Sequence, residues 1–145
     1  MSGGDVFFDT NVLLYLLAND SQKADRVEGL LVQRGVINAQ VLNEFAAVAL
    51  RKHALSLSEL REALESIREL CVANPMSVEI HERGLDIIER YGFSLYDSMI
   101  VAAALQANCR ILYTEDLQHG QVIEKRLTVI NPFTGRSPMN PFAVG

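Results

Sequence analysis

Carboxylates stand in four short segments of this 145-residue chain, at positions from which they could bind one metal ion together. The segments are Phe8-Asp9-Thr10-Asn11, Asn43-Glu44-Phe45, Leu95-Tyr96-Asp97-Ser98 and Tyr113-Thr114-Glu115-Asp116. Asp9 ends the apolar run 6–8 and Asp116 follows the strand-like run 110–113. In open α/β sheets, groups at the carboxyl ends of strands line the ligand crevice. Carboxylates gathered there repel one another unless a cation lies between them, so the pattern predicts a Mg²⁺ or Mn²⁺ site.

Asp9 and Asp97 are the best candidates for direct ligands, because Mg²⁺ typically takes one or two carboxylates and keeps several waters. The sheet fixes Asp9, whereas Asp97 at the start of a predicted helix has an alternative role as a cap or a partner of the helix dipole. Glu44 lies in an apolar helical segment, where a carboxylate is seldom buried unless it is paired or bound to metal. A solvated helix face is the alternative for Glu44, and a simple turn is the alternative for Asp116.

Thr10 and Asn11 follow Asp9 directly, within hydrogen-bonding range of a carboxylate or a metal-bound water. Their alternative role is to cap the first predicted helix.

The composition is that of a globular protein, with 49% hydrophobic and 21% charged residues, and the length favours one domain. No apolar stretch is long enough for a membrane span, and the N-terminus does not resemble a signal peptide. Cys71 and Cys109 are expected to be buried free thiols, which favours the cytoplasm. The net charge of −5 argues against a global field for nucleic acid, so an RNA site would depend on local cations such as Arg51, Lys52 and Arg110.

Hydrophobic periodicity predicts strands that alternate with helices, and hence a mainly parallel sheet with helices on both faces. The predicted strands are 5–9, 36–39, 110–113 and one further strand near the end. The predicted helices are 10–18, 21–33 with Ser21 as a possible cap, 40–53, one from Ser58 to a break at Asn74-Pro75, 77–90 and 96–108. Residues 1–133 are expected to form one domain, and 134–145 a flexible tail.

All four segments, in order and approximate spacing, resemble the acidic motifs of PIN domains, and more narrowly those of VapC-type toxins of bacterial toxin–antitoxin pairs. The resemblance covers about residues 5–133 and implies a three-layer α/β/α sandwich with Mg²⁺- or Mn²⁺-dependent ribonuclease activity. Motif position assigns the acidic quartet to Asp9, Glu44, Asp97 and Asp116. It assigns supporting roles to Asn11 and Thr114, and leaves open whether Glu115 contributes.

The family likeness also implies a mechanism and partners. Metal-activated water would cleave RNA and leave a 5′-phosphate and a 3′-hydroxyl. The partners would be a cognate antitoxin, whose C-terminal segment covers the acidic cleft, and a second copy of the chain. We expect the apolar helix stripe of Leu60, Leu64 and Ile67 to supply the dimer surface.

Two other functions compete with the nuclease. An aspartyl-phosphate-type phosphatase would want a second Asp two residues after Asp9, where Asn11 stands. A non-catalytic PIN-like module that binds RNA or protein is the second alternative, although a complete acidic set without metal repels phosphate.

Overall fold

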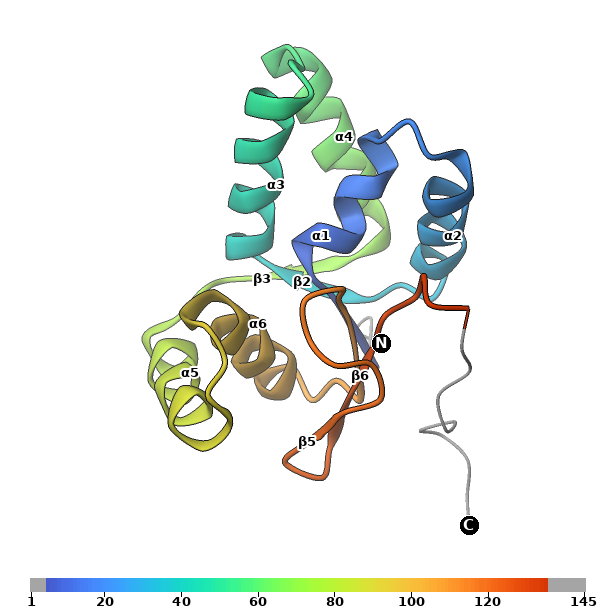
Figure 1. Ribbon diagram of the computed structural model, residues 1–145. Helices are drawn as coiled ribbons and strands as arrows, with labels where there is room; N and C mark the ends of the chain where they lie inside the picture. The colour runs from blue at the N-terminus through green and yellow to red at the C-terminus, as the bar shows by residue number, and fades with distance from the viewer. Residues whose placement is uncertain (1–4, 136–145) are drawn as a thin grey trace.

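The computed structural model describes residues 5–135, and a six-stranded sheet lies at its centre (Figure 1). The strand order is β3-β2-β1-β4-β6-β5. All neighbours pair in parallel except β5 and β6, which are antiparallel. The strands are β1 (Val6–Phe8), β2 (Val36–Asn38), β3 (Val72–Asn74), β4 (Ile111–Tyr113), β5 (Val122–Ile123) and β6 (Leu127–Ile130). The predicted mainly parallel sheet is confirmed.

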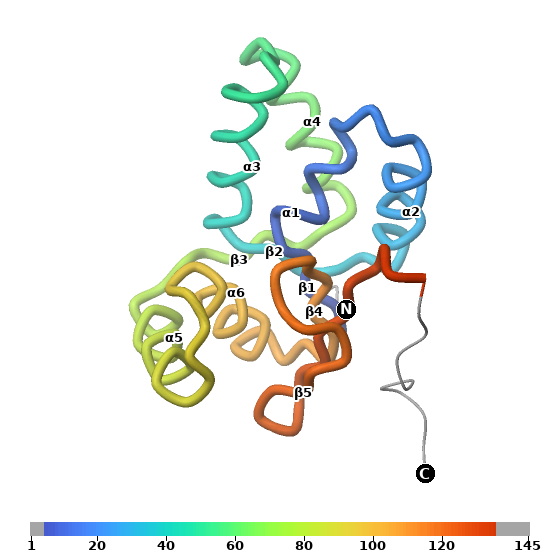
Figure 2. The backbone as a smooth tube through the Cα atoms, in the orientation of Figure 1, coloured from blue at the N-terminus to red at the C-terminus, as the bar shows by residue number. Residues whose placement is uncertain are grey.

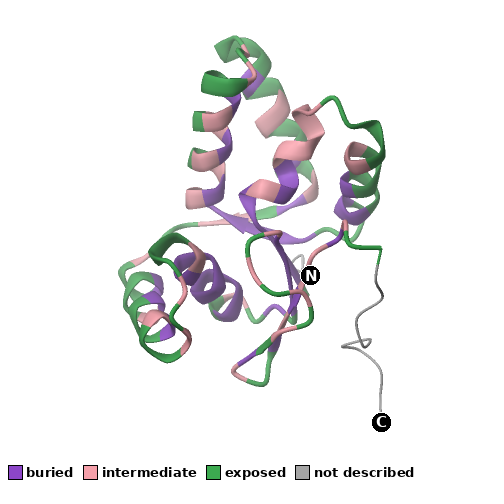
Figure 3. Cartoon of the chain, viewed as in Figure 1, coloured by how far each residue is buried: buried purple, intermediate pink, exposed green. Residues whose placement is uncertain are grey.

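Helices cover both faces of the sheet, which confirms the predicted three-layer α/β/α sandwich. Figure 1 shows α1 to α4 on one side of the sheet and α5 with α6 on the other. The helices are α1 (Thr10–Leu13), α2 (Ser21–Leu31), α3 (Ala39–Lys52), α4 (Leu57–Leu70), α5 (Val78–Tyr91) and α6 (Leu95–Gln106). Helix α6 is buried continuously from Ser98 to Leu105 (Figure 3), because its small residues 102–104 let it lie close to its neighbours.

Several helix starts differ from the prediction, because the residue that caps the helix is not the one expected from the sequence. Asp20, not Ser21, caps α2 by accepting a hydrogen bond from the Lys23 N–H. Helix α4 begins at Leu57 rather than at residue 58, since Ser56 and Glu59 form a reciprocal capping box. The predicted helix 10–18 is a short α-helix, α1, followed by a 3₁₀ turn, η1 (Leu14–Leu17).

Two short strands, β3 and β5, were missing from the prediction. Strand β3 follows α4 with only Cys71 between them, and Cys71 continues the apolar stripe of that helix. Three residues are too few to show an alternation of their own. Strand β5 has two residues and pairs only with β6.

The apolar stripe of α4 packs into the core, so its predicted role as a dimer surface is wrong. Leu60 is 4% exposed and Ile67 is 2% exposed, while Leu64 is partly buried against the same core. Cys71 and Cys109 are both buried, as predicted, and they form no disulfide among the described residues. Within residues 5–135, no helix is both long and apolar enough to cross a bilayer. The predicted tail lies outside the described residues from residue 136 onward.

The strand order reverses between β1 and β4, which lie side by side at the centre of the sheet (Figure 2). From β1 the chain continues to β2 and β3 on one side, and later returns to β4 on the other. Open α/β sheets bind ligands at such a switch point, beyond the carboxyl ends of the strands. Asp9 follows β1 and residues 114–116 follow β4, so two of the four acidic segments meet at this point.

Candidate metal centre

Asp9 is held rigidly where β1 ends. Its backbone N–H donates to the Tyr113 carbonyl at 3.0 Å, which continues the pairing of β1 with β4 by one residue. Its side chain caps α1: Oδ1 accepts from the Thr10 N–H at 2.7 Å, and Oδ2 accepts from the Thr114 hydroxyl at 2.8 Å. Asp9 is only 5% exposed, and burial is the main reason why its pKa rises to about 7. Both hydrogen bonds oppose this rise, and the charges of Asp116 and Glu44 add to it.

The Thr114 hydroxyl connects three parts of the centre. It donates to Asp9 and accepts from the Asp116 N–H at 3.1 Å and from Asn11 Nδ2 at 3.3 Å. One donated and two accepted bonds use the full capacity of a hydroxyl group. Thr114 is 1% exposed. A supporting role for Thr114 and Asn11 therefore has a physical basis, since together they orient Asp9 and the backbone that carries Asp116.

Three carboxylates converge here: Asp9, Asp97 and Asp116 each offer an oxygen, and these oxygens all lie within 4.8 Å of one another. Asp9 is buried, Asp97 is half-buried and Asp116 is exposed, so the cluster opens to solvent on one side. Opposite ligands of a Mg²⁺ ion lie about 4.2 Å apart, twice the usual bond length of about 2.1 Å. The spacing and the all-oxygen donor set therefore fit a hard divalent cation.

Asp97 reaches the cluster from the first turn of α6. Ser94 caps this helix and accepts a hydrogen bond from the Asp97 N–H at 3.2 Å, so Asp97 is not the N-cap. Burial raises the pKa of Asp97, the hydrogen bond with Ser94 lowers it, and the charge of Asp116 raises it further. A carboxylate in the first turn also interacts favourably with the helix dipole.

Glu44 lies near this cluster but outside it. The side chain is half-buried on α3, and its Oε1 accepts a hydrogen bond from Gln40 Nε2 at 2.8 Å. Glu44 does not belong to the group of oxygens within 4.8 Å, yet its charge is close enough to raise the pKa of Asp9. The structure thus brings three of the four predicted acids together and holds the fourth at the margin.

Thr10 and Asn11 do not cap α1, because Asp9 does so. Asn11 instead links α1 to the segment after β4, donating to Thr114 and accepting from the Glu115 N–H at 3.4 Å. Thr10 is 4% exposed, and its hydroxyl has no hydrogen-bond partner among the described residues.

The Glu115 side chain is held by a contact that the sequence analysis missed. Its Oε1 accepts from the Tyr15 hydroxyl at 2.9 Å, and Lys23 Nζ in turn donates to that hydroxyl at 3.4 Å. The Lys23 ammonium also lies 4.6 Å from the centre of the Tyr15 ring and 5.2 Å from that of Phe133. Glu115 does not belong to the three-carboxylate group. Its hydrogen bond with Tyr15 instead anchors the segment that carries Asp116. Tyr15 stands in an apolar run that gives no sign of this role.

The basic residues named in the sequence analysis do not surround the cluster. Arg110 directly precedes β4 and pairs with Asp5 at 3.0 Å. Both residues therefore lie at the amino-terminal ends of the central strands, whereas the carboxylates lie at the carboxyl ends. Arg51 and Lys52 lie in the last turn of α3, whose first residue follows β2. At about 1.5 Å per residue, they are about 18 Å further along the helix.

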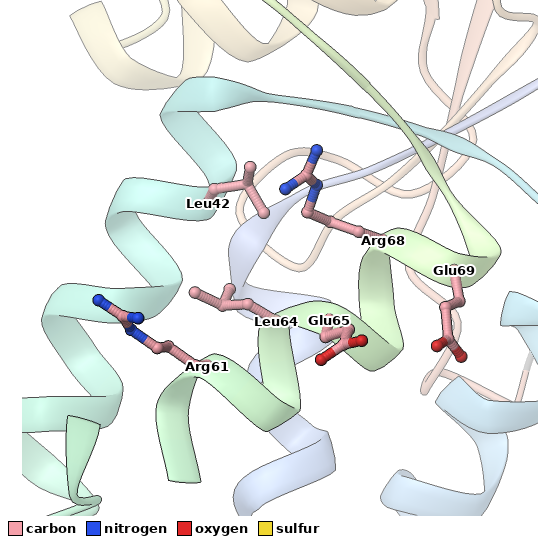
Figure 4. Close-up of a pocket in the computed structure, with 6 residues that line it drawn as sticks. All are labelled: Leu42, Arg61, Leu64, Glu65, Arg68 and Glu69. Carbon is pink, nitrogen blue, oxygen red and sulfur yellow. The ribbon is translucent and has the colours of Figure 1, made fainter. Parts of the chain in front are cut away.

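Two of the hollows in the described part of the chain lie among η1, α2, α3 and α4, and none of the four acids lines either of them. The larger, about 600 Å³, lies between α3 and α4, where Leu42 and Leu64 approach each other and Arg61 and Arg68 lie at its two ends (Figure 4). The smaller, about 380 Å³, is lined mainly by apolar side chains of η1, α2, α3 and α4.

Comparison with known proteins gives one matching family model and similar folds. The family model of the PIN domain matches residues 6–125. The fold is similar to that of Mycobacterium tuberculosis VapC20, a sarcin–ricin loop cleaving toxin, with a TM-score of 0.62 and 15% identity over 77% of this chain and 90% of that one. It is also similar to a chain of a toxin–antitoxin complex from Klebsiella pneumoniae, with a TM-score of 0.69 and 20% identity over 89% and 98%. A sequence comparison with curated proteins gives no match.

Proposed function

The chain belongs to the PIN-domain family, and on that premise we propose that it is a Mg²⁺- or Mn²⁺-dependent endoribonuclease, the toxin of a toxin–antitoxin pair. The observation that carries the proposal is the convergence of Asp9, Asp97 and Asp116 at the switch point of the sheet. Three carboxylates at this spacing repel phosphate on their own. With a bound cation they attract it, which favours a metal-dependent enzyme over a module that only binds RNA.

Asp9, Asp97 and Asp116 would hold the ion, with Glu44 acting from outside this group through a metal-bound water. When bound, a divalent ion polarises a phosphodiester oxygen and lowers the pKa of a water molecule. Asp9 presents a fixed oxygen, because its two hydrogen bonds leave its side chain little freedom. Its raised pKa means that it is partly protonated near neutral pH in the absence of metal, so metal binding releases a proton there.

An RNA substrate and an antitoxin partner are proposals supported by the fold neighbours, one described as a cleaver of the sarcin–ricin loop and the other as part of a toxin–antitoxin complex. The family resemblance implies that hydrolysis would leave a 5′-phosphate and a 3′-hydroxyl. The antitoxin would cover the cluster with its C-terminal segment and bring an Arg or Lys to the carboxylates. Such a substrate and partner would place the protein in the cytoplasm.

A homodimer remains part of the proposal, on a surface other than the one first expected. Strand β3 is an edge strand, and Val72, Met76 and Val78 on or after it are 41%, 37% and 75% exposed. Light scattering at micromolar concentration should give twice the monomer mass. A monomer mass would rule out the proposed homodimer.

Cleavage of an RNA panel by purified protein tests the proposed activity. After EDTA treatment, we expect activity only when Mg²⁺ or Mn²⁺ is restored, with 5′-phosphate product ends. Asp116→Asn should be inactive, whereas Asp20→Asn, the same change at an exposed cap of α2, should be fully active. RNA that is bound without being cut under every metal condition would favour the non-catalytic alternative.

A further inference from the structure

Helix α4 carries a second stripe of side chains, on a face that looks away from the core. Its members are Leu57, Arg61, Leu64 and Arg68, four positions that share one face of a helix because they are spaced i, i+4, i+7 and i+11. Leu57 is 58% exposed, both arginines are exposed, and only the half-buried Leu64 also contacts the core. This face, which we call the α4 stripe, alternates apolar and cationic residues.

The hollow of about 600 Å³ between α3 and α4 opens on the α4 stripe. Figure 4 shows the guanidinium groups of Arg61 and Arg68 on the side of α3, with Leu64 between them. The carboxylates of Glu65 and Glu69 lie on the side away from α3. Within residues 5–135, neither arginine of the stripe forms a salt bridge, although three other arginines do. The hollow therefore offers two uncompensated cations on either side of an apolar contact.

Helix α5 carries a stripe of the same spacing and the opposite charge. Val78, Glu82, Leu85 and Glu89 again stand at i, i+4, i+7 and i+11 of one helix. Val78 is 75% exposed, Leu85 is 42% exposed and both glutamates are exposed. In the described part of the chain, neither glutamate forms a salt bridge. This α5 stripe alternates apolar and anionic residues.

The two stripes match each other residue by residue. Seven residues of helix span about 10.5 Å, so the two arginines of α4 are as far apart along their helix as the two glutamates of α5. When two such helices lie side by side in either direction, each arginine faces a glutamate and Leu64 faces Leu85. Guanidinium and carboxylate groups form paired hydrogen bonds in such contacts. RNA could use the arginines, but it would leave the α5 stripe without a partner.

The stripes of one molecule cannot meet each other, because α4 and α5 cover opposite faces of the sheet (Figure 1). We propose that the α4 stripe of one copy binds the α5 stripe of a second copy, and that two copies exchange stripes in a closed dimer. Both contacts of such a two-fold dimer are then identical. Strand β3 connects α4 to α5, so this interface adjoins the exposed edge of the sheet. The inference rests on the proposed homodimer and names its interface.

Reversing the charges of one stripe at a time tests this pairing. Arg61→Glu with Arg68→Glu makes both stripes anionic, and Glu82→Arg with Glu89→Arg makes both cationic. Each double variant alone should dimerise at least about 10-fold more weakly than the parent, because like charges face each other. A 1:1 mixture should recover the dimer of the parent, since every facing pair is again of opposite charge. Sedimentation equilibrium at micromolar concentration measures all three samples, and recovery in the mixture also shows that both variants are folded.

Two further variants separate the stripes from general charge. Arg51→Glu with Lys52→Glu changes the net charge as much as the α4 variant does, at the exposed end of α3, and should dimerise as the parent does. Leu85→Ala removes the apolar residue at the middle of the α5 stripe. It should weaken the dimer by about 5-fold or more.

The outcomes distinguish this interface from the proposals that surround it. Dimers of unchanged affinity in both charge-reversed variants would overturn it, and so would a mixture that stays monomeric. A parent that forms assemblies larger than a dimer would overturn the closed exchange of stripes. A monomeric parent would remove the homodimer together with this interface. RNA cleavage by the same preparation would still decide the proposed ribonuclease activity separately.

Discussion

Asp9→Asn should stabilise the metal-free protein, and the gain should grow with pH. The folded-state pKa of Asp9 is raised from 3.8 to about 7, mainly by burial, so the folded protein holds a proton that the unfolded chain has lost. Stability is therefore lost as pH rises from 3.8 to about 7, by about 1.4 kcal/mol for each pH unit. Asparagine has no such loss, and it caps a helix about as well as aspartate does.

The size of the effect follows from that slope. Between pH 5 and the raised pKa of about 7 there are about two pH units, or about 3 kcal/mol. The variant should therefore gain about 3 kcal/mol over the parent between pH 5 and pH 8, which is roughly 10 °C in Tm for a chain of this length. Below pH 3.8 Asp9 is protonated in both states, and the two proteins should differ little.

Thermal and urea unfolding in EDTA at pH 5 and pH 8 measure this difference. Asp20→Asn, the same change at the exposed cap of α2, keeps Asp9 and should unfold together with the parent at both pH values. Mg²⁺ at 100 times its Kd should stabilise the parent by about 2.7 kcal/mol and the Asp9 variant much less. An Asp9→Asn gain that is the same at pH 5 and pH 8 would refute the view that burial raises the pKa of this carboxylate.

Three further predictions concern other parts of the molecule. Asp97→Asn should raise the metal-free Tm by less than Asp9→Asn, since Asp97 is only half-buried, and calorimetry should show little remaining Mg²⁺ stabilisation. Gly35→Ala should cost about 1–3 kcal/mol in urea unfolding, because its Cβ would lie 2.5 Å from a core ring, whereas Gly29→Ala meets nothing within 4 Å and should add up to about 1 kcal/mol. Tyr15→Phe should slow RNA cleavage and cost about 1 kcal/mol of stability, because Glu115 loses its anchor.

The sheet and the strand-end acids were predictable because both follow from short-range patterns. An apolar run that ends in a polar residue predicts a buried strand and its carboxyl end. Parallel pairing of β1 with β4 then brings Asp9 and the residues after β4 together at the carboxyl ends of these strands. Strand β3 was not predictable, since three residues after a helix show no period of their own.

The remainder of the centre depends on contacts between distant segments. The hydrogen bond from Tyr15 to Glu115 joins residues 100 positions apart, and no local pattern in the apolar run around Tyr15 indicates it. The choice between capping and metal binding for Asp97 rests on Ser94, which takes the cap and leaves the Asp97 side chain available. The position of Glu44 at the margin of the cluster depends on how α3 packs, which periodicity alone does not determine.

The position of a bound ion tests the central claim most directly. Anomalous scattering from a crystal soaked in Mn²⁺ locates the metal without reference to activity. We expect a peak among the carboxylates of Asp9, Asp97 and Asp116, at about 2.1–2.2 Å from their oxygens, and no peak there in Asp116→Asn crystals soaked in the same way. A soaked parent crystal with no peak among these three side chains would contradict the metal centre and the ribonuclease function proposed from it.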